Sequence, residues 1–162
     1  MDEQLESLAA EVGAALKQRG LWLVSAESCT GGWVGEAITA VSGSSQWYDR
    51  GFITYTDQSK QDMLGVNEAT LGNYGAVSEE TVIEMAQGAL QHSCADVAVA
   101  ISGIAGPTGG TAEKPVGLVW FAWAAKNGAR SSEKHIFPGD RREVRRLAVE
   151  TALKGVLALL EI

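Results

Sequence analysis

The chain has 162 residues, 46% of them hydrophobic, which suits one domain over residues 1–162 with a core large enough to need no disulfide or structural metal. Its formal net charge of -7 argues against a general nucleic-acid-binding protein, because such a surface needs basic side chains that replace the counterions of the phosphates. No apolar run approaches the roughly 20 residues of a membrane span, no secretory leader pattern is present and there are only two cysteines, so we expect a reduced, cytoplasmic protein without a membrane partner.

Helical periodicity alternates with short apolar runs along the chain. Apolar residues at steps of three and four predict amphipathic helices, and a hydroxyl or acid at the start or a glycine at the end marks their caps. In chain order we expect a helix over 5–16 that Gly20 ends, a strand over 21–25, a helix over 33–38, a strand over 50–55, a short helix between Thr56 and Gly65, a helix after Ser78, strands over 97–101, 116–124 and 131–137, and a long helix after Asp140.

Two of these segments predict how the sheet is built. The run VAVAI at 97–101 has no polar alternation, which indicates a strand buried on both faces in the middle of a sheet. Asn127 and Gly128 lie between the last two strands and form a strong hairpin signal, so an antiparallel pair should extend that sheet. Helices before, between and after the strands imply an α/β protein with a mixed sheet.

The turn after the first strand concentrates groups that can carry chemistry. It holds Ser28, Cys29 and Thr30, followed by Gly31 and Gly32, whose backbone can approach a ligand closely. Such turns lie at the carboxyl edge of a sheet, where open α/β folds bind ligands. The same residues also suit a helix start, with Ser28 or Thr30 as the cap. Cys29 is either a small buried residue or a thiol nucleophile activated at a helix start.

A serine nucleophile needs a base, which limits the partners of Ser28. His92 and His135 are the only histidines, and neither accompanies a triad motif. Clustered Cys and His ligands are absent, so we expect no metal. Lys60 remains, because it follows the strand that ends at Tyr55 and that should finish near the turn. An exposed helix lysine is the alternative, since a lysine acts as a base only when its pKa is lowered.

Four arginines crowd the start of the last helix, where the helix dipole disfavours cations and like charges four residues apart repel. They are Arg141, Arg142, Arg145 and Arg146. Clustered guanidinium groups at a helix start suit a phosphate or carboxylate ligand. A solvated basic face or a salt-bridged subunit contact explains the cluster equally well.

Aromatic residues near strands usually bury a large apolar area, so we expect most of the five tryptophans to lie in the core. Trp47 follows a serine-rich loop, where its ring could instead contact a second copy of the chain or stack on a planar ligand. We expect a dimer contact there.

Several stretches, taken together and in order, resemble the CinA carboxy-terminal domain family over nearly the whole chain. They are residues 26–32 (AESCTGG), 53–55 with Lys60, 64–66, 75–80, 103–107 with 109–110 and 114–117, and 137–141. The resemblance implies a three-layer α/β/α sandwich around a mixed, mostly parallel sheet, usually as a homodimer or higher homo-oligomer. Ser102 stands where threonine is frequent in this family.

Members of the family are similar to nicotinamide-nucleotide amidases, which hydrolyse the carboxamide of nicotinamide mononucleotide and need no cofactor. The resemblance implies Ser28 as the nucleophile, Lys60 as the general base and Tyr55 as a supporting group, with backbone N–H groups of 29–31 around the oxyanion. The substrate-binding residues that it implies are Thr30, Gly31, Gly32, Gly103, Gly106, Arg141 and Arg142, with Arg141 as the first candidate for the phosphate. A non-catalytic nucleotide-binding module and an amidase that uses Cys29 are the alternatives.

Overall fold

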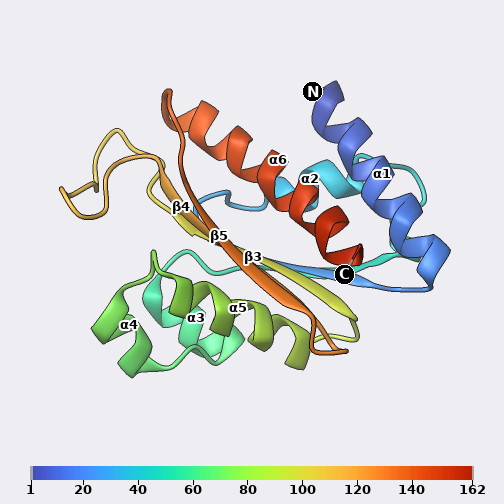
Figure 1. Cartoon of the computed structure of the whole chain (residues 1–162), viewed down its shortest axis with the longest axis horizontal. Coiled ribbons are helices and arrows are strands. Elements are labelled where there is room, and N and C mark those ends of the chain that lie inside the picture. Colours follow the sequence, from blue (N-terminus) through green and yellow to red (C-terminus); the bar gives the residue numbers. More distant parts are fainter. Residues whose placement is uncertain (1, 162) are drawn as a thin grey trace.

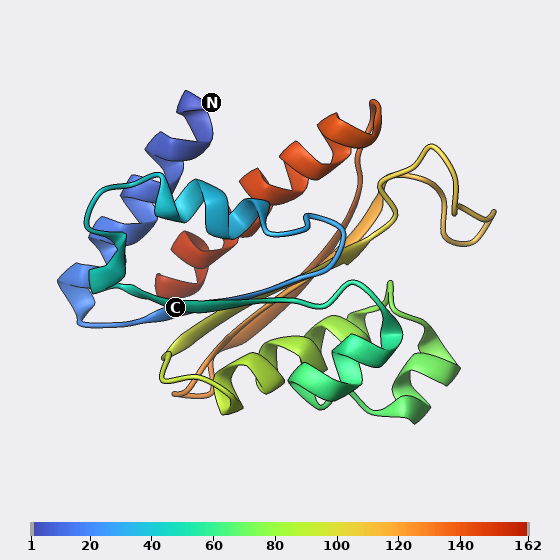
Figure 2. The same cartoon turned by 180° about the vertical axis from the view of Figure 1, so that it is seen from behind.

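A computed structural model describes residues 2–161, in which one five-stranded sheet lies between two layers of helices (Figures 1 and 2). Helices α1, α2 and α6 cover one face of the sheet, and α3, α4 and α5 lie on the other. The elements are α1 (Glu3–Arg19), β1 (Leu23–Glu27), α2 (Trp33–Thr39), the 3-10 turn η1 (Ser44–Gln46), β2 (Tyr48–Ile53), α3 (Asp57–Leu64), α4 (Glu68–Tyr74), α5 (Glu79–Gln91), β3 (Val97–Gly103), β4 (Leu118–Ala125), β5 (Arg130–Ile136) and α6 (Arg141–Leu160).

The strand order is β2-β1-β3-β4-β5. β1 pairs in parallel with both β2 and β3, whereas β4 is antiparallel to its two neighbours, so β4 alone runs against the other strands of this sheet. The expected α/β sandwich around a mixed sheet is therefore confirmed. In the register of these pairs Glu27 lies opposite both Ile53 and Ile101. The carboxyl ends of β1, β2 and β3 consequently meet at one edge, as ligand-binding edges of α/β sheets do.

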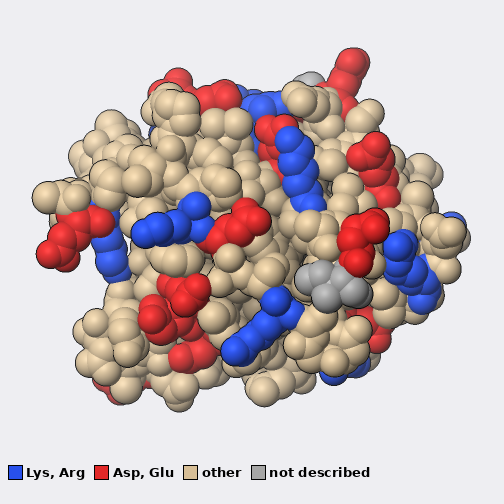
Figure 3. All heavy atoms as spheres, in the orientation of Figure 1, with Lys and Arg blue, Asp and Glu red and all other residues tan. Residues whose placement is uncertain are grey.

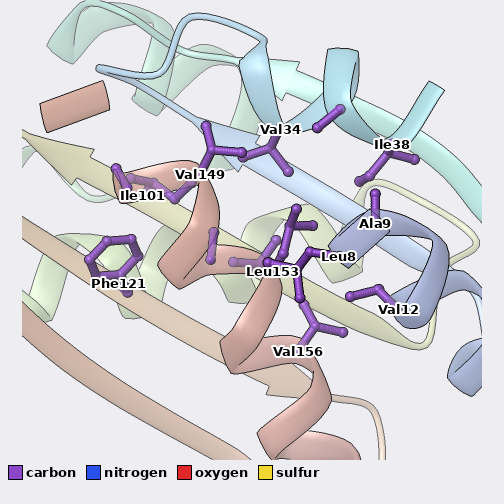
Figure 4. Packing of buried hydrophobic residues seen from close by; sticks show 14 of the residues in the cluster. Leu8, Ala9, Val12, Val34, Ile38, Ile101, Phe121, Val149, Leu153 and Val156 are labelled. Atoms are coloured by element: carbon purple, nitrogen blue, oxygen red, sulfur yellow. The ribbon is translucent and has the colours of Figure 1, made fainter. Parts of the chain in front are cut away.

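The two faces of the central strands differ in side-chain size. Val97, Val99 and Ile101 of β3 enter the core that α1, α2 and α6 cover, while Ala98 and Ala100 enter the core on the α5 side. Because interiors are close-packed, the alanine face lets α5 lie close to the sheet. Figure 4 shows the first of these cores, in which α6 residues meet the sheet and α1 through Leu8, Val12, Ile101, Phe121, Val149, Leu153 and Val156.

Most of the expected helix ends are confirmed with their capping residues. Gly20 ends α1 and Gly65 ends α3, both in the left-handed conformation that glycine adopts without strain. Thr56, Ser78 and Asp140 cap α3, α5 and α6, and each side-chain oxygen accepts a hydrogen bond from the backbone N–H three residues later. The buried strand expected over 97–101 and the hairpin after it are also present as β3, β4 and β5.

Three segments differ from the expectation. β2 spans Tyr48–Ile53 and not 50–55, so Tyr55 lies two residues beyond the strand that it was expected to end. β1 begins two residues later than expected and continues to Glu27, so part of the anticipated turn is strand. Helix α4 was not expected, because it is short, contains Gly72 and lacks a side-chain cap of its own. A side chain of α5 replaces this cap, because the Glu84 carboxylate accepts hydrogen bonds from Asn67 and Thr70.

The expected dimer contact at Trp47 is wrong. The Trp47 side chain is only 2% exposed and belongs to the core of its own chain. Its indole lies against Gly13 of α1, where an added Cβ would come within 2.4 Å of the ring. The absence of a side chain at Gly13 thus provides the space that the ring fills.

On the face drawn in Figure 3, basic and acidic side chains are interspersed, and the positive charge of the described residues is not gathered into one surface there. Within residues 2–161 no helix combines the length and the apolar character that crossing a bilayer requires. In the same range, no three His, Cys, Asp or Glu side chains converge in a way that could hold a metal ion.

Candidate active site

Ser28 is the first residue after β1 and lies at the sheet edge where three parallel strands end. Its N–H donates to the Ile101 carbonyl oxygen at 3.1 Å, which fixes the turn to the neighbouring strand β3. The residue is 7% exposed, so its hydroxyl reaches solvent only through the adjoining pocket. Neither Ser28 nor Thr30 caps α2 by a side-chain bond, because the N-cap position is Gly32.

Lys60 of α3 reaches this hydroxyl from the opposite wall of the pocket. Its side-chain Nζ lies 2.9 Å from Ser28 Oγ and 2.7 Å from the Thr54 carbonyl oxygen. Thr54 is itself fixed to the sheet, since its N–H donates to the Glu27 carbonyl at 2.8 Å. A neutral amine has two hydrogens and one lone pair. When it donates one hydrogen to the Thr54 carbonyl oxygen, its lone pair can still accept the hydrogen of the Ser28 hydroxyl.

Burial has the largest effect on the pKa of Lys60, because only 1% of this residue is exposed to solvent. The loss of solvation holds the pKa of the Lys60 amine below its usual value, and the nearby Asp57 carboxylate only partly opposes this shift. The structure therefore excludes the interpretation of Lys60 as an exposed helix lysine. A lysine with a lowered pKa that contacts a serine hydroxyl is a chemically competent base.

The pocket beside Ser28 and Lys60 has a volume of about 290 Å³ and is bordered by both glycine-containing turns. Tyr55 and Arg141 stand at its rim. The Arg141 guanidinium donates to the Gly106 carbonyl at 2.8 Å and to the Tyr55 hydroxyl at 3.1 Å. These bonds use two of the five guanidinium N–H donors, and the others are available to a ligand.

The second glycine loop, residues 103–110, supplies another part of the pocket lining. Gly103 and Gly106 both line the pocket, and both positions lack room for a side chain. A Cβ at Gly103 would lie 2.9 Å from the Leu118 carbonyl oxygen, and one at Gly106 would lie 2.4 Å from Val116, where φ is also +81°. The glycines thus let the loop pack against the start of β4.

Ser102 is a further pocket residue, for which the sequence predicted no role. It is 1% exposed, lines the pocket, and its hydroxyl has no hydrogen-bond partner among the described residues. Its signal in the sequence is its position: it directly follows the buried run 97–101 on the strand beside β1.

The structure does not bring four of the expected substrate-binding residues to this pocket. Thr30, Gly31, Gly32 and Arg142 border a different hollow of about 410 Å³ between α1, α2 and the start of α6. Positive φ angles of 60° and 103° at the two glycines turn the chain back, and Thr30 then points to the Glu27 carboxylate. The Arg142 guanidinium lies over the Trp33 ring at 5.0 Å.

Only some of the backbone N–H groups in this turn are free to bind a ligand. The Gly31 N–H donates to the Ser28 carbonyl, and the Gly32 N–H donates to Glu27, so neither is free for an oxyanion. The N–H groups of Cys29 and Thr30 have no hydrogen-bond partner within residues 2–161. Of these two residues only Cys29 lines the Ser28 pocket.

The Cys29 thiol is poorly suited to act as a nucleophile. Burial raises its pKa to about 11, although the nearby Arg145 guanidinium opposes that shift. A thiol needs to be deprotonated to attack, and burial in apolar surroundings prevents this. The pKa of this thiol therefore favours the interpretation of Cys29 as a small buried residue.

Comparisons with known proteins agree with this architecture. A family described as the CinA C-terminal domain matches residues 5–160. The chain is 54% identical over 156 residues to "Nicotinamide-nucleotide amidohydrolase PncC" of Enterobacter agglomerans, covering 96% of this chain and 95% of that protein. The protein of the same name from Escherichia coli K12 is 54% identical over 153 residues, covering 94% and 93%. The crystal structure of the competence/damage inducible protein CihA from Agrobacterium tumefaciens superposes with a TM-score of 0.94 at 48% identity, covering 96% of this chain and 94% of that one. This chain therefore belongs to the CinA C-terminal domain family.

Proposed function

We propose that this chain hydrolyses the carboxamide of nicotinamide mononucleotide to nicotinic acid mononucleotide and ammonia, with Ser28 as the nucleophile and Lys60 as the general base. The observation that carries the proposal is the 2.9 Å contact between Lys60 Nζ and Ser28 Oγ at the floor of a pocket. The relatives named nicotinamide-nucleotide amidohydrolase support the substrate class.

In the acylation step, neutral Lys60 takes the proton of Ser28 while Oγ attacks the carboxamide carbon. The protonated amine then gives this proton to the amide nitrogen as the C–N bond breaks, which releases ammonia and leaves an acyl ester on Ser28. The Thr54 carbonyl accepts a hydrogen bond from Nζ throughout, so the amine keeps its orientation in both protonation states.

In the deacylation step, Lys60 takes a proton from water as the water oxygen attacks the ester, and Ser28 recovers its proton when the acid product leaves. The Cys29 N–H supports the developing oxyanion in both steps, because it is the unpaired backbone donor next to Ser28. A donor of this kind contributes about 3 kcal/mol in comparable sites.

Arg141 is the proposed phosphate contact, because its guanidinium lies at the pocket rim with donors to spare. Arg142 is not part of this contact in the proposal, since it stacks on Trp33 outside the pocket. A phosphate held at the rim would direct the ring and its carboxamide toward Ser28, which makes the free base nicotinamide a poor substrate.

The two alternatives have less support. A non-catalytic binding module predicts an exposed, fully protonated Lys60, whereas the residue is buried and its pKa is lowered. An amidase that uses Cys29 needs a thiolate, whereas burial raises the pKa of this thiol to about 11.

Ammonia release from the mononucleotide, the corresponding nucleoside and the dinucleotide tests the proposal. We expect the mononucleotide to be the preferred substrate and Ser28→Ala to lower its turnover by at least about 10³-fold. Cys29→Ala keeps the backbone N–H and should lose far less. Saturable nucleotide binding without ammonia would exclude the enzymatic function, and full activity in Ser28→Ala would exclude the serine mechanism.

We also propose that the chain self-associates, as the family resemblance implies. The contact cannot rest on Trp47, which is buried in its own chain. Sedimentation equilibrium should give a mass of at least twice the 17.1 kDa of the chain, and a monomer at micromolar concentration would contradict the proposal.

A further inference from the structure

The turn that carries Ser28 is held by a buried carboxylate on one side. Glu27 is 2% exposed, and its Oε1 accepts hydrogen bonds from Thr30 Oγ1 at 2.6 Å, from the Gly32 N–H at 3.1 Å and from the Val34 N–H at 3.0 Å. Its Oε2 accepts from the Gly35 N–H at 3.1 Å.

These bonds replace a cap that α2 lacks. The N-cap residue of α2 is Gly32, which has no side chain to accept the first free N–H groups of the helix. Glu27 takes that role from the preceding strand, at the helix end where the dipole favours negative charge. Since Glu27 is also the residue directly before Ser28, one side chain joins the strand end, the turn and the helix start.

A guanidinium group holds the same turn from the other side. Arg145 of α6 donates through Nε to the Cys29 carbonyl at 3.0 Å and through Nη2 to the Thr30 carbonyl at 3.1 Å. The plane of this group also lies over the Trp33 ring at 5.5 Å. The two carbonyls belong to the residues that directly follow Ser28, so two charged side chains, of opposite sign, bind the backbone that follows the serine.

Neither Glu27 nor Arg145 lines the pocket of Ser28 and Lys60. Their contacts are with the backbone of the turn and of α2, with the Thr30 hydroxyl and with the Trp33 ring. They therefore cannot touch a substrate in that pocket directly, and any effect on the reaction has to pass through the position of the turn, which carries the Ser28 hydroxyl and the Cys29 N–H.

We propose that Glu27 and Arg145 are positioning residues that hold the Ser28 hydroxyl at the attack distance from Lys60 Nζ. The inference rests on the proposed serine mechanism. Its physical basis is that a nucleophile displaced by about 1 Å loses on the order of 10²-fold in rate even when the displaced group makes no contact with substrate. The backbone bond from the Gly31 N–H to the Ser28 carbonyl closes the turn, and the bonds of Glu27 and Arg145 add the supporting shell that holds a functional residue to this precision.

The matched pair of variants is Arg145→Met and Arg146→Met, because the two arginines are neighbours on α6 with different partners. Arg146 pairs with Asp2 and Gln4 near the start of α1 and has no contact with the Ser28 turn. Both substitutions remove one cation and keep an unbranched apolar stem. Thermal unfolding of each variant measures how much stability the substitution removes.

For Arg145→Met we expect kcat for nicotinamide mononucleotide to fall about 10²-fold with KM within about threefold of wild type, whereas Arg146→Met should leave both within about threefold. Arg145→Lys keeps the charge but cannot donate to both carbonyls in the same fork geometry, so it should fall between the two. Glu27→Gln replaces one acceptor oxygen by an NH₂ group, which faces at least one of the four N–H and O–H donors that now point at the carboxylate. Because two donors cannot bond to each other, this variant should also lower kcat, by about tenfold.

A second readout separates this inference from the proposed function. Phenylmethylsulfonyl fluoride forms a sulfonyl ester on an activated serine, and intact-mass measurement follows its rate without any nucleotide. The rate at Ser28 should fall in Arg145→Met by about the same factor as kcat and should be unchanged in Arg146→Met.

Each outcome decides the question. Labelling and turnover in Arg145→Met equal to those in Arg146→Met would overturn the positioning role. If wild-type Ser28 is labelled but releases no ammonia, the proposed function fails while the labelling rates still test Arg145. If Arg145→Met does not fold, Arg145→Lys carries the comparison, and wild-type rates in that variant would overturn the inference. A wild-type protein that shows neither labelling nor turnover would overturn both.

Discussion

The side-chain nitrogen of Lys60 and the hydroxyl of Ser28 lie 2.9 Å apart although 32 positions separate them in the chain. The distance depends on where α3 sits against the sheet edge. One close contact fixes that position: Gly88 of α5 meets the backbone of Leu64, which lies one helical turn after Lys60.

Gly88→Ala should therefore destabilise the protein and lower activity together. A Cβ at this position would lie 1.9 Å from the Leu64 carbonyl oxygen, so α3 has to move away from α5 and carry Lys60 with it. We expect a loss of about 1–3 kcal/mol in the free energy of unfolding, measured by urea denaturation. The control is Gly72→Ala in the exposed part of α4, where an added Cβ would meet no neighbouring atom within 4 Å. Alanine should stabilise this helix by about 0.5–1 kcal/mol relative to glycine. Equal stability of the two variants would contradict the close contact.

Lys60→Met should change how stability depends on pH. Burial lowers the pKa of Lys60 in the folded protein below the ordinary value of 10.5 that it has in the unfolded chain. At a pH between these two pKa values the unfolded chain therefore binds more protons than the folded protein. The resulting destabilisation is fully present below the folded pKa and disappears as the pH rises toward 10.5. The stability of Lys60→Met relative to wild type should thus be highest near neutral pH and should decrease at alkaline pH. Urea unfolding between pH 7 and pH 10 measures this difference, and a constant difference would show that Lys60 has an ordinary pKa in the folded state.

The acidic side of the pH–rate profile should respond to Asp57. In the proposed mechanism activity should fall as the pH is lowered through the pKa of Lys60, because the protonated amine cannot accept the serine proton. The Asp57 carboxylate raises this pKa, so Asp57→Asn should move the acidic limb of kcat/KM to lower pH. Asp62→Asn on the same helix is the control, since its carboxylate is not among the groups that shift Lys60. A limb that moves equally in both variants would point to a general charge effect.

Arg141→Met and Arg142→Met should separate phosphate recognition from packing. Arg141 stands at the pocket rim, so its loss should raise KM for the mononucleotide by about 10-fold or more, with a much smaller effect on the nucleoside. Arg142 stacks on Trp33 outside the pocket, and its loss should change KM for the mononucleotide by less than about threefold. Steady-state kinetics with both substrates decide between the residues, and a larger effect at Arg142 would move the phosphate to the neighbouring hollow.

The sequence by itself determined the element types, most helix ends and the buried central strand. These features depend on residues that are close in the chain, such as Thr56 capping α3 or Gly20 ending α1. The strand 97–101 was identifiable because it lacks polar alternation. The family resemblance then supplied Ser28 and Lys60 as a pair, which spacing left open.

Tertiary structure alone decided which side chains face the pocket. Adjacent residues on a helix point about 100° apart, so the four clustered arginines diverge. Arg141 reaches the pocket, Arg142 and Arg145 share the Trp33 ring, and Arg146 reaches the start of α1. The sequence gives no means of choosing among them. Likewise the turn after Ser28 reverses at Gly31 and Gly32 and sends Thr30 to Glu27, away from the pocket. The burial of Lys60 follows from the packing of α3 against α5 and the sheet edge, and it is this desolvation, invisible in the sequence, that lowers the pKa of the amine.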